Sequence, residues 1–475
     1  MAIGDVVPEI ALVVAAVAAL LLASFVTHER QGWCALVALI GLGASFFACV
    51  LQFTDAPKLS FSGAWVLDGA AIWARLLIAG GTALVVTMTP GWMRSDRRHG
   101  EYYALLLLSA AGAMLMAGAA DLLELSVGVL LSSITGYTLA AYHRAWSISV
   151  EAGVKYFLIG AFANTLLMIG VTLIFGMLGS TRYDAIAVRM SEGASASPLL
   201  VIGAGLTILG IAFKMGAVPV HSWMPDVAEG APAPSAAFLT VVPKIGAAVA
   251  LARVVMLFPV DLIDLRPLIA VLAALTMTLG NLAALWQSDL RRLLGWSSVS
   301  QSGYALVAVA VIGRTSGALP ALIFFLLGYA AANLTAFAVV THLRGRTRIE
   351  DYAGLWRQRP WVAFALILAL FSLVGIPPLG GFVGKLTVFL AAIDGGYGWL
   401  AALAVANTVA SLFYYLRVIG PAYFAAPGSD VWTLSRGSGV AVLLASALII
   451  ALGVGAALLL SPLQGHDFLI IAEAG

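Results

Sequence analysis

Long uncharged runs constrain this chain more than any other feature of its sequence. Residues 10–27 and 156–181 carry no charged side chain, and of all 475 residues 62% are hydrophobic while only 10% are charged. A soluble domain carries about a quarter charged residues, and a disordered chain needs low hydrophobicity, so both classes are excluded. A bilayer core ~30 Å thick needs about 20 apolar residues per helix. We therefore expect an all-α, polytopic membrane protein.

The apolar runs, separated by short polar segments, predict fourteen transmembrane helices. Fourteen spans of about 20 residues leave short loops and no room for a soluble domain. The predicted spans are 8–26, 33–52, 65–89, 103–120, 122–141, 153–177, 199–217, 232–257, 266–286, 293–313, 317–341, 361–390, 397–419 and 438–460.

The arginines predict the orientation of the chain, because short cytoplasmic loops are enriched in lysine and arginine. They gather in loops after odd-numbered spans, and with fourteen spans both termini are then predicted on the periplasmic side. The first residues lack the basic region of a signal peptide, so we expect the first span to be retained. The arginines after odd-numbered spans are Arg94, Arg97, Arg98, Arg144, Arg291, Arg292, Arg344, Arg346, Arg348, Arg357 and Arg359.

Several classes of function lack support in the sequence. The net charge is +2 without a basic arm, so no electrostatic footprint for nucleic acid is present. No CxxC, HExxH, GxxxxGK[ST] or GxGxxG motif indicates a metal or nucleotide site. The two cysteines, Cys34 and Cys49, lie in one apolar run and are interpreted as helix-packing thiols.

Two interruptions lie deep inside apolar segments, at residues 213–219 and 375–385. Each contains proline, which removes a backbone donor and breaks a helix, and each carries one lysine. Membrane proteins tolerate such breaks where the freed backbone groups line a wet cavity or find protein partners. Broken helices at corresponding places in two halves are typical of inverted-repeat transporters. We therefore predict broken helices seven and twelve.

The lysines are rare and unusually placed. Only five of the 25 cationic residues are lysine, and Lys214, Lys244 and Lys385 lie within predicted spans. An intramembrane charge is expensive and marks a functional site by default. Lysine, unlike arginine, can release its proton when buried. The three are therefore candidate proton carriers, with a structural ion pair as the alternative.

Other polar residues near the spans leave alternatives open. Glu151 precedes Lys155 by four residues, which favours a helix pair, and the pair is either a helix cap or the start of a polar path. His221 lies between predicted spans seven and eight with Asp226 and Glu229. Imidazole is a natural proton relay, whereas the spacing of the three fits no standard metal site.

Asp68 and Arg75, seven residues apart, share one helical face and are interpreted as a structural pair.

Five segments resemble the antiporter-like membrane subunits of respiratory complex I, most closely subunit N of NADH–quinone oxidoreductase. They occur in the family's order across most of residues 100–420. The segments are Glu151-Ala-Gly-Val-Lys155-Tyr-Phe, Phe213-Lys214 followed by Val-Pro-Val-His221-Ser-Trp-Met-Pro-Asp226-Val-Ala-Glu229-Gly-Ala-Pro, Gly280-Asn281-Leu-Ala-Ala-Leu-Trp-Gln, Arg291-Arg292-Leu-Leu-Gly-Trp-Ser-Ser, and Ser372-Leu-Val-Gly-Ile-Pro-Pro-Leu-Gly-Gly-Phe-Val-Gly-Lys385.

The resemblance implies fourteen helices with two inverted five-helix repeats, in a multi-pass protein of the bacterial inner membrane. The implied divisions are 1–102, a three-helix segment; 103–257, the first repeat; 258–419, the second repeat; and 420–475, a C-terminal helix and tail.

The resemblance also implies proton translocation coupled to quinone reduction elsewhere. Lys214 and Lys385 would serve the two half-channels, Lys244 would connect them, and His221 would belong to the central polar axis. The chain itself would hold no cofactor, because NADH, FMN, iron–sulfur clusters and quinone would be bound by partner subunits. The expected partners are the other membrane-arm subunits, together with lipid and protons.

The sequence departs from the family's pattern at two positions. Leu130 stands where the family has a fifth-helix glutamate, and Gln301 stands where a histidine is common. Glu124 is the nearest acid but lies six residues earlier, about 9 Å along the axis and about 120° around the helix. We therefore expect Lys214 to lack its usual carboxylate, with Glu124 a poor substitute.

Three functions remain open on the sequence alone. The first is a proton-conducting subunit of complex I that performs no redox chemistry itself. The second is a subunit of a complex I-related hydrogenase or of a multi-subunit cation/proton antiporter. The third is a structural spacer whose channel has decayed.

Overall fold

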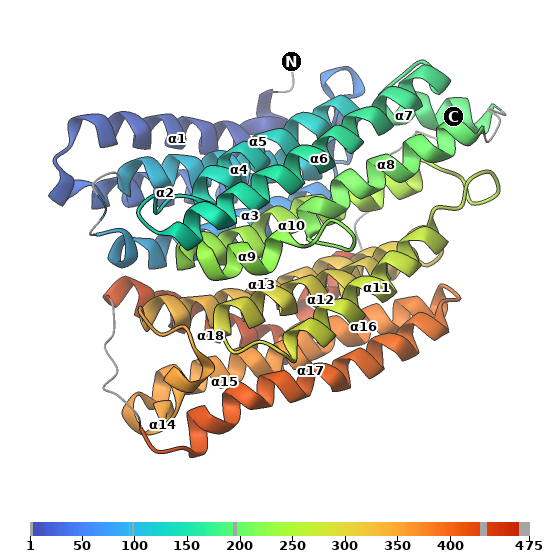
Figure 1. The fold of residues 1–475 in the computed structure, drawn as a ribbon. Helices are drawn as coiled ribbons and strands as arrows, with labels where there is room; N and C mark the ends of the chain where they lie inside the picture. Colours follow the sequence, from blue (N-terminus) through green and yellow to red (C-terminus); the bar gives the residue numbers. More distant parts are fainter. Residues whose placement is uncertain (1–2, 95, 97–98, 193–196, 428–434, 465–475) are drawn as a thin grey trace.

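The fold was analysed in a computed structural model that describes residues 3–94, 96, 99–192, 197–427 and 435–464. Most of these residues are helical, and Figure 1 shows long helices running side by side in one bundle, with α1–α10 in one half and α11–α18 in the other. Of the arginines used to predict the orientation, Arg97 and Arg98 lie outside the described residues, as do 428–434 and 465–475 of the C-terminal segment predicted at 420–475.

The helices of the first half end with the buried helix α10. They are α1 (Val7–Phe25), α2 (Gly32–Gln52), α3 (Gly69–Met93), α4 (His99–Gly118), α5 (Leu122–Ala140), α6 (Ser147–Leu178), α7 (Tyr183–Ser191), α8 (Pro198–Met215), α9 (Trp223–Gly230) and α10 (Ala233–Met256).

The helices of the second half include the buried helix α13. They are α11 (Arg266–Ala284), α12 (Leu290–Ala310), α13 (Ala318–His342), α14 (Leu355–Gln358), α15 (Pro360–Val374), α16 (Gly380–Asp394), α17 (Gly398–Phe424), α18 (Arg436–Val454) and α19 (Ala456–Gln464). Short 3-10 turns lie at Ile3–Val6, His28–Arg30, Phe61–Gly63 and Ile349–Tyr352.

A small hairpin is an addition to the helical fold. Strands β1 (Lys58–Ser60) and β2 (Trp65–Leu67) pair antiparallel between α2 and α3, with Leu59 opposite Val66. The third predicted span therefore begins later than expected, because residues 65–67 are extended and Asp68 caps α3 by accepting a hydrogen bond from the amide of Ala71 at 2.9 Å.

Twelve helices among the described residues are long and apolar enough to cross a membrane. Predicted span ten coincides with α12, and predicted span twelve coincides with the shorter helices α15 and α16. The chain is thus a polytopic helical membrane protein, and the count of fourteen crossings stays a prediction.

Each predicted interruption overlaps a gap between two helices: residues 216–222 separate α8 from α9, and residues 375–379 separate α15 from α16. The chain leaves α8 at Gly216, with φ of 67°, and leaves α15 at Gly375, with φ of 93°. Both angles lie in the left-handed region, which glycine adopts without steric cost. A Cβ on Gly216 would also collide with Met224. Glycine therefore lets each helix end inside the bundle.

The core lies where the two halves meet. Helices α10 and α13 are buried along almost their whole length and contact each other, whereas α1, α2, α6, α11 and α17 expose apolar side chains on the outside. Because the outer surface is as apolar as the core, the bundle presents a face suited to lipid or to other helices.

Candidate functional site

Lys214 lies in the last turn of α8 and is fully buried. Its Nζ donates to the hydroxyl of Tyr156 at 3.3 Å and to that of Ser132 at 3.4 Å. It also lies 5.6 Å from the centre of the Tyr156 ring. Among the described residues, no carboxylate oxygen lies within 4.0 Å of Lys214. The lysine is therefore surrounded by hydroxyl and aromatic groups rather than by an ion-pair partner.

Aromatic packing fixes the surroundings of Lys214. The ring of Tyr156, on α6, stacks on Trp223 of α9 with centroids 4.2 Å apart. Trp223 in turn donates its indole N–H to the carbonyl of Phe213 at 3.1 Å, at the end of α8. The same carbonyl also accepts from the backbone N–H of Gly216 at 2.9 Å, so the indole adds a second bond at the helix end. The break after α8 is thus braced by the short helix α9.

Lys244 lies in the middle of α10, one residue after Pro243, and is also fully buried. Its Nζ donates to the carbonyl and the hydroxyl of Ser298 at 2.7 and 2.8 Å, and to the hydroxyl of Tyr329 at 3.4 Å. Lys244 therefore joins α10 to α12 and α13, at the junction of the two halves.

Lys385 lies in the second turn of α16 and is 3% exposed. Its Nζ donates to the carbonyl of Val374, the last residue of α15, at 2.9 Å. It also lies 4.3 Å from the centre of the Tyr304 ring. The lysine thus occupies the second interruption, where the end of α15 supplies an acceptor and α12 supplies an aromatic face.

Helix α12 supplies polar groups between the three lysines. Ser302 donates to the carbonyl of Met215, next to Lys214, and lies 3.0 Å from the carbonyl of Ser298, which holds Lys244. The amide of Gln301 donates to the carbonyl of Leu373 at 3.1 Å, beside the second interruption. Polar groups of α12 therefore lie between the end of α8 and the contacts of Lys244.

The residues around His221 form a network nearer the surface. Asp226 accepts from Lys155 at 3.1 Å and from Arg292 at 2.6 Å, and Lys155 also pairs with Glu151 at 2.7 Å.

Arg292 also reaches Glu229 at 2.7 Å. The ring of His221 packs against Trp296 with centroids 5.6 Å apart, and no hydrogen bond within the described ranges joins it to the three lysines. The structure therefore brings Asp226 and Glu229 into an ion network spanning α6, α9 and α12, and leaves His221 beside it.

Leu130 and Glu124 both lie away from Lys214. Leu130 is 37% exposed and lines an outer groove with Asn164 of α6. Ser132, two residues on and about 200° around the helix, makes the contact with Lys214. Glu124 lies in the first turn of α5, beyond the cap formed by Asp121, and makes no ion pair with Lys214. The structure agrees with the expectation that Glu124 does not replace the missing carboxylate.

The predicted pairing of Asp68 with Arg75 is wrong. Asp68 accepts two hydrogen bonds of 2.8 Å from Arg253 at the end of α10, and Arg75 pairs with Glu9 of α1 at 2.8 Å. Asp68 caps α3 from outside, so its carboxylate points away from the helical face on which the prediction relied.

Sequence reasoning missed the hydroxyl groups that hold the lysines. Ser132, Tyr156, Ser298 and Tyr329 are ordinary residues in apolar helices when taken singly. One signal was present: residues 297–302 read Ser-Ser-Val-Ser-Gln-Ser inside an otherwise apolar run. Such a polar cluster in a buried helix indicates partners that need hydrogen bonds.

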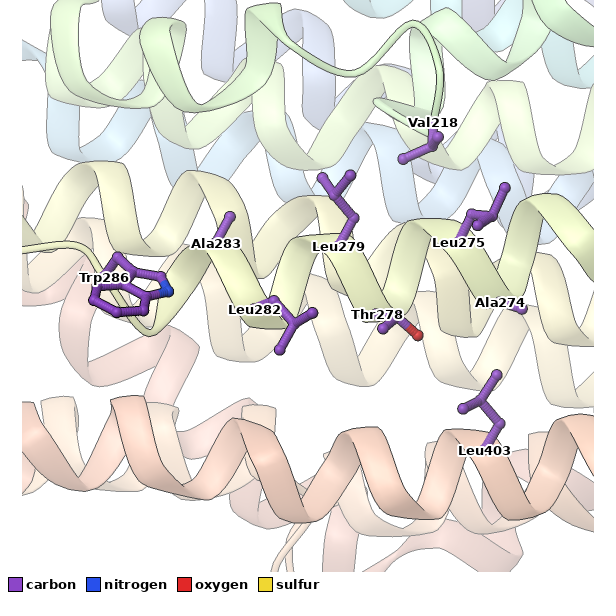
Figure 2. A pocket seen from close by; sticks show the side chains of 9 residues that line it. All are labelled: Val218, Ala274, Leu275, Thr278, Leu279, Leu282, Ala283, Trp286 and Leu403. Carbon is purple, nitrogen blue, oxygen red and sulfur yellow. The ribbon is translucent and has the colours of Figure 1, made fainter.

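A groove of about 590 Å³ on the outer surface lies apart from this site. Figure 2 shows it between α11 and α17, with Val218 of the first interruption at its edge. Apart from Thr278 and the indole of Trp286, its lining side chains are aliphatic. It lacks the titratable groups that a relay needs.

Comparison with known proteins identifies the family. The family model described as "NADH:quinone oxidoreductase/Mrp antiporter, TM" matches residues 119–411. The chain is 45% identical over 411 residues to NADH-quinone oxidoreductase subunit N of Mycobacterium sp. (strain JLS), covering 86% of each protein. The chain belongs to the subunit N family. It is also 43% identical to subunit N 1 of Streptomyces griseus, covering 96% of this chain and 97% of the relative.

Solved structures agree with subunit N membership. A chain of respiratory complex I from Thermus thermophilus with bound aureothin is 31% identical, with a TM-score of 0.83, covering 96% of this chain and 98% of that one. The Mrp complex from Dietzia is similar in fold, at 23% identity and a TM-score of 0.82. The chain is thus an antiporter-like membrane subunit of the complex I type.

Proposed function

We propose that this chain is the subunit N of a proton-pumping NADH–quinone oxidoreductase, and that it moves protons through Lys214, Lys244 and Lys385, here called the relay lysines. The coupled quinone reduction takes place in other subunits. One observation carries this proposal: the three lysines are buried without carboxylate partners in the described region. Polar side chains of α12 bond directly to Lys244 and to backbone carbonyls near the other two lysines.

The chemistry follows from the surroundings of the relay lysines. A charged ammonium group in a dry interior is costly, so each lysine gains by passing its proton to a neighbour. Hydroxyl groups can both accept and donate, and each relay lysine has hydroxyl or carbonyl groups in reach. A proton arriving at one lysine raises the cost of charging the next. These properties favour stepwise transfer over fixed ion pairing.

The structure supports two related halves, corresponding to residues 103–257 and 258–419. Asp121 and Asp289 each cap the second helix of a half. Each also forms an isolated antiparallel β-bridge through its backbone, Asp121 with Arg182 and Asp289 with Arg348. The two caps are separated by 168 residues, as are the close contacts of Gly112 with Ser132 and of Gly280 with Ser300. Because both the helix caps and the glycine–serine contacts recur after the same number of residues, they favour an internal repeat. Residues 1–102 and 420–475 would then be flanking segments.

The remaining candidates have peripheral roles in this proposal. Glu151 and Lys155 lead protons toward the site through Asp226, and His221 extends the polar axis at the first interruption. Glu124 is the weakest of the proposed relay residues, because it lies at the far end of α5 from Lys214's contacts.

The proposed setting is the bacterial inner membrane, with the arginine-rich loops cytoplasmic and both termini periplasmic. The partners are other membrane-arm subunits of the complex, which would bind NADH, FMN, iron–sulfur clusters and quinone. The described residues offer no group of three or more His, Cys, Asp or Glu that could hold a metal.

A second candidate is a subunit of a complex I-related hydrogenase or a cation/proton antiporter. The matching folds of the Mrp complex and of a sulfane sulfur reductase, each at 23% identity, support a shared architecture only. Relatives called subunit N at 40–45% identity favour the first candidate.

Replacing Lys385 by arginine tests the proposal in inverted membrane vesicles that oxidise NADH. Arginine keeps the positive charge but cannot release the proton. We expect assembled complex with a lower ratio of protons pumped to NADH oxidised. Lys58→Arg is the matched control, because Lys58 is a half-exposed lysine that pairs with Asp5 in the hairpin region. Normal pumping by Lys385→Arg would contradict the relay.

A further inference from the structure

A cavity lined by polar and apolar side chains lies at one end of α5 and α6. Its volume is about 800 Å³, and its lining includes Asp96, Glu101, Tyr137, Thr138, His143 and Phe157. We call it the α5–α6 vestibule. At ~30 Å³ per water it has room for on the order of twenty waters. It lies at the end of the bundle where Arg144 sits, which the arginine distribution predicts to be cytoplasmic.

The mouth of the vestibule is held in shape by the turn between α5 and α6. The indole of Trp92 donates to Nε2 of His143 at 3.0 Å, and Nδ1 of His143 lies 3.4 Å from the carboxylate of Asp96. Burial lowers the pKa of His143, and the nearby Asp96 carboxylate opposes that effect. Since Nε2 accepts a hydrogen bond, His143 braces the mouth as a neutral ring. The acid left to exchange protons is Glu101, which has no ion-pair partner among the described residues.

Tyr137 separates the vestibule from Lys214. Tyr137 lines the cavity, and its buried hydroxyl makes no hydrogen bond of good geometry with the described residues, although the polar side chains of Ser133 and Asn164 lie nearby. A buried hydroxyl with polar neighbours and no well-formed bond suits an internal water or a proton-transfer role. The hydroxyl lies against Gly160, where any side chain would collide with it.

Tyr156 contacts both Tyr137 and the lysine. The rings of Tyr137 and Tyr156 meet edge to face with centroids 4.8 Å apart. The hydroxyl of Tyr156 lies 3.3 Å from Nζ of Lys214. The two tyrosines therefore lie in contact with each other between the vestibule and the buried lysine.

We infer that the α5–α6 vestibule is the entrance through which protons reach Lys214, that Glu101 collects them, and that Tyr137 is the gate. At each hop a hydroxyl or water accepts one proton on oxygen and gives up another, so that Tyr137 regains its O–H and one proton is added to neutral Lys214. This inference rests on the proposed function and adds the route and its residues.

Thiol labelling tests whether water reaches the vestibule. Thr138 is exposed and lines the cavity, while the native Cys34 and Cys49 are buried. In inverted vesicles, Thr138→Cys should react with a membrane-impermeant, charged methanethiosulfonate, and the attached group should remove most NADH-driven proton uptake. Thr165→Cys is the matched control, since Thr165 lies in the outer groove of α6. No labelling of Thr138→Cys, or labelling without loss of proton uptake, would overturn the inference.

Two conservative substitutions test the individual residues. Tyr137→Phe keeps the ring and removes only the hydroxyl, and Glu101→Gln keeps the shape and removes the charge; both should lower the ratio of protons pumped to NADH oxidised. Glu101→Asp keeps a carboxylate, so this variant should pump at a near-normal ratio, unlike Glu101→Gln. A residue with a merely structural role would not depend on the carboxylate in this way. Glu350→Gln, an exposed carboxyl in the arginine-rich loop after α13, is the control.

The outcomes distinguish a failure of the proposed entrance from a failure of the proposed function. If Lys385→Arg lowers the pumping ratio while the Tyr137 and Glu101 variants pump normally, the relay stands and the entrance lies elsewhere. If all of these variants pump normally, the proposed function fails as well.

Discussion

Replacing Lys214 by methionine should separate function from stability. The two hydrogen bonds of Lys214 are 3.3 and 3.4 Å long, beyond the usual 2.7–3.2 Å range. A hydrogen bond made by a charged group contributes about 1.5–3 kcal/mol, and bonds of this length fall at the low end of that range. Taking the ammonium ion out of water costs several kcal/mol. The two bonds therefore do no more than offset that cost, so the charged lysine does not stabilise the folded state.

Methionine fills the same space with a flexible, apolar chain. We expect the free energy of unfolding to stay the same or to rise by about 1–4 kcal/mol, as when other buried charges are replaced by apolar groups. The proton relay, by contrast, loses its first carrier, so proton uptake per NADH should fall. The assays are the thermal denaturation midpoint of the purified complex and proton uptake by inverted vesicles.

Lys58→Met serves as the control, because Lys58 is half-exposed and contacts Asp5 rather than the relay. The reasoning is refuted if Lys214→Met lowers the denaturation midpoint markedly while leaving pumping intact. That result would make Lys214 a structural cation.

Two further substitutions probe the charged residues near the other end of the bundle. Asp68→Asn keeps the cap on α3 but leaves Arg253 buried without its counter-charge, so it should destabilise the chain by about 3–5 kcal/mol. Thermal denaturation measures this loss, with Asp55→Asn at an exposed position as the control. Equal stability of the two variants would argue against the buried ion pair. Glu124→Gln should leave proton uptake per NADH near normal, because Glu124 makes no ion pair with Lys214, and abolished uptake would show that this geometric argument fails.

The sequence alone determined the class of fold and the residues worth testing. Apolar runs of membrane-spanning length allow only helices in lipid, because every backbone group must be satisfied internally. Lys214, Lys244 and Lys385 stood out because charge in such runs is costly. The glycines and prolines at 213–219 and 375–385 marked the interruptions, since these residues act on the local backbone.

Only the tertiary structure decided which groups meet. Asp68 pairs with Arg253, 185 residues away, rather than with its near neighbour Arg75. Lys214 is held by Tyr156 and Ser132 from two other helices. Hydropathy cannot reveal such partners, because lipid-facing and protein-facing sides of a membrane helix are equally apolar.

The vestibule shows the same limit. Glu101 comes from α4, whereas Tyr137 and His143 come from the end of α5 and the turn after it, and none carries a pattern that predicts a cavity. A cavity arises from the way helices splay and turns fold over them, which depends on side-chain packing between remote segments. The sequence fixes what each helix can bury, and the packing of the bundle fixes where water can enter it.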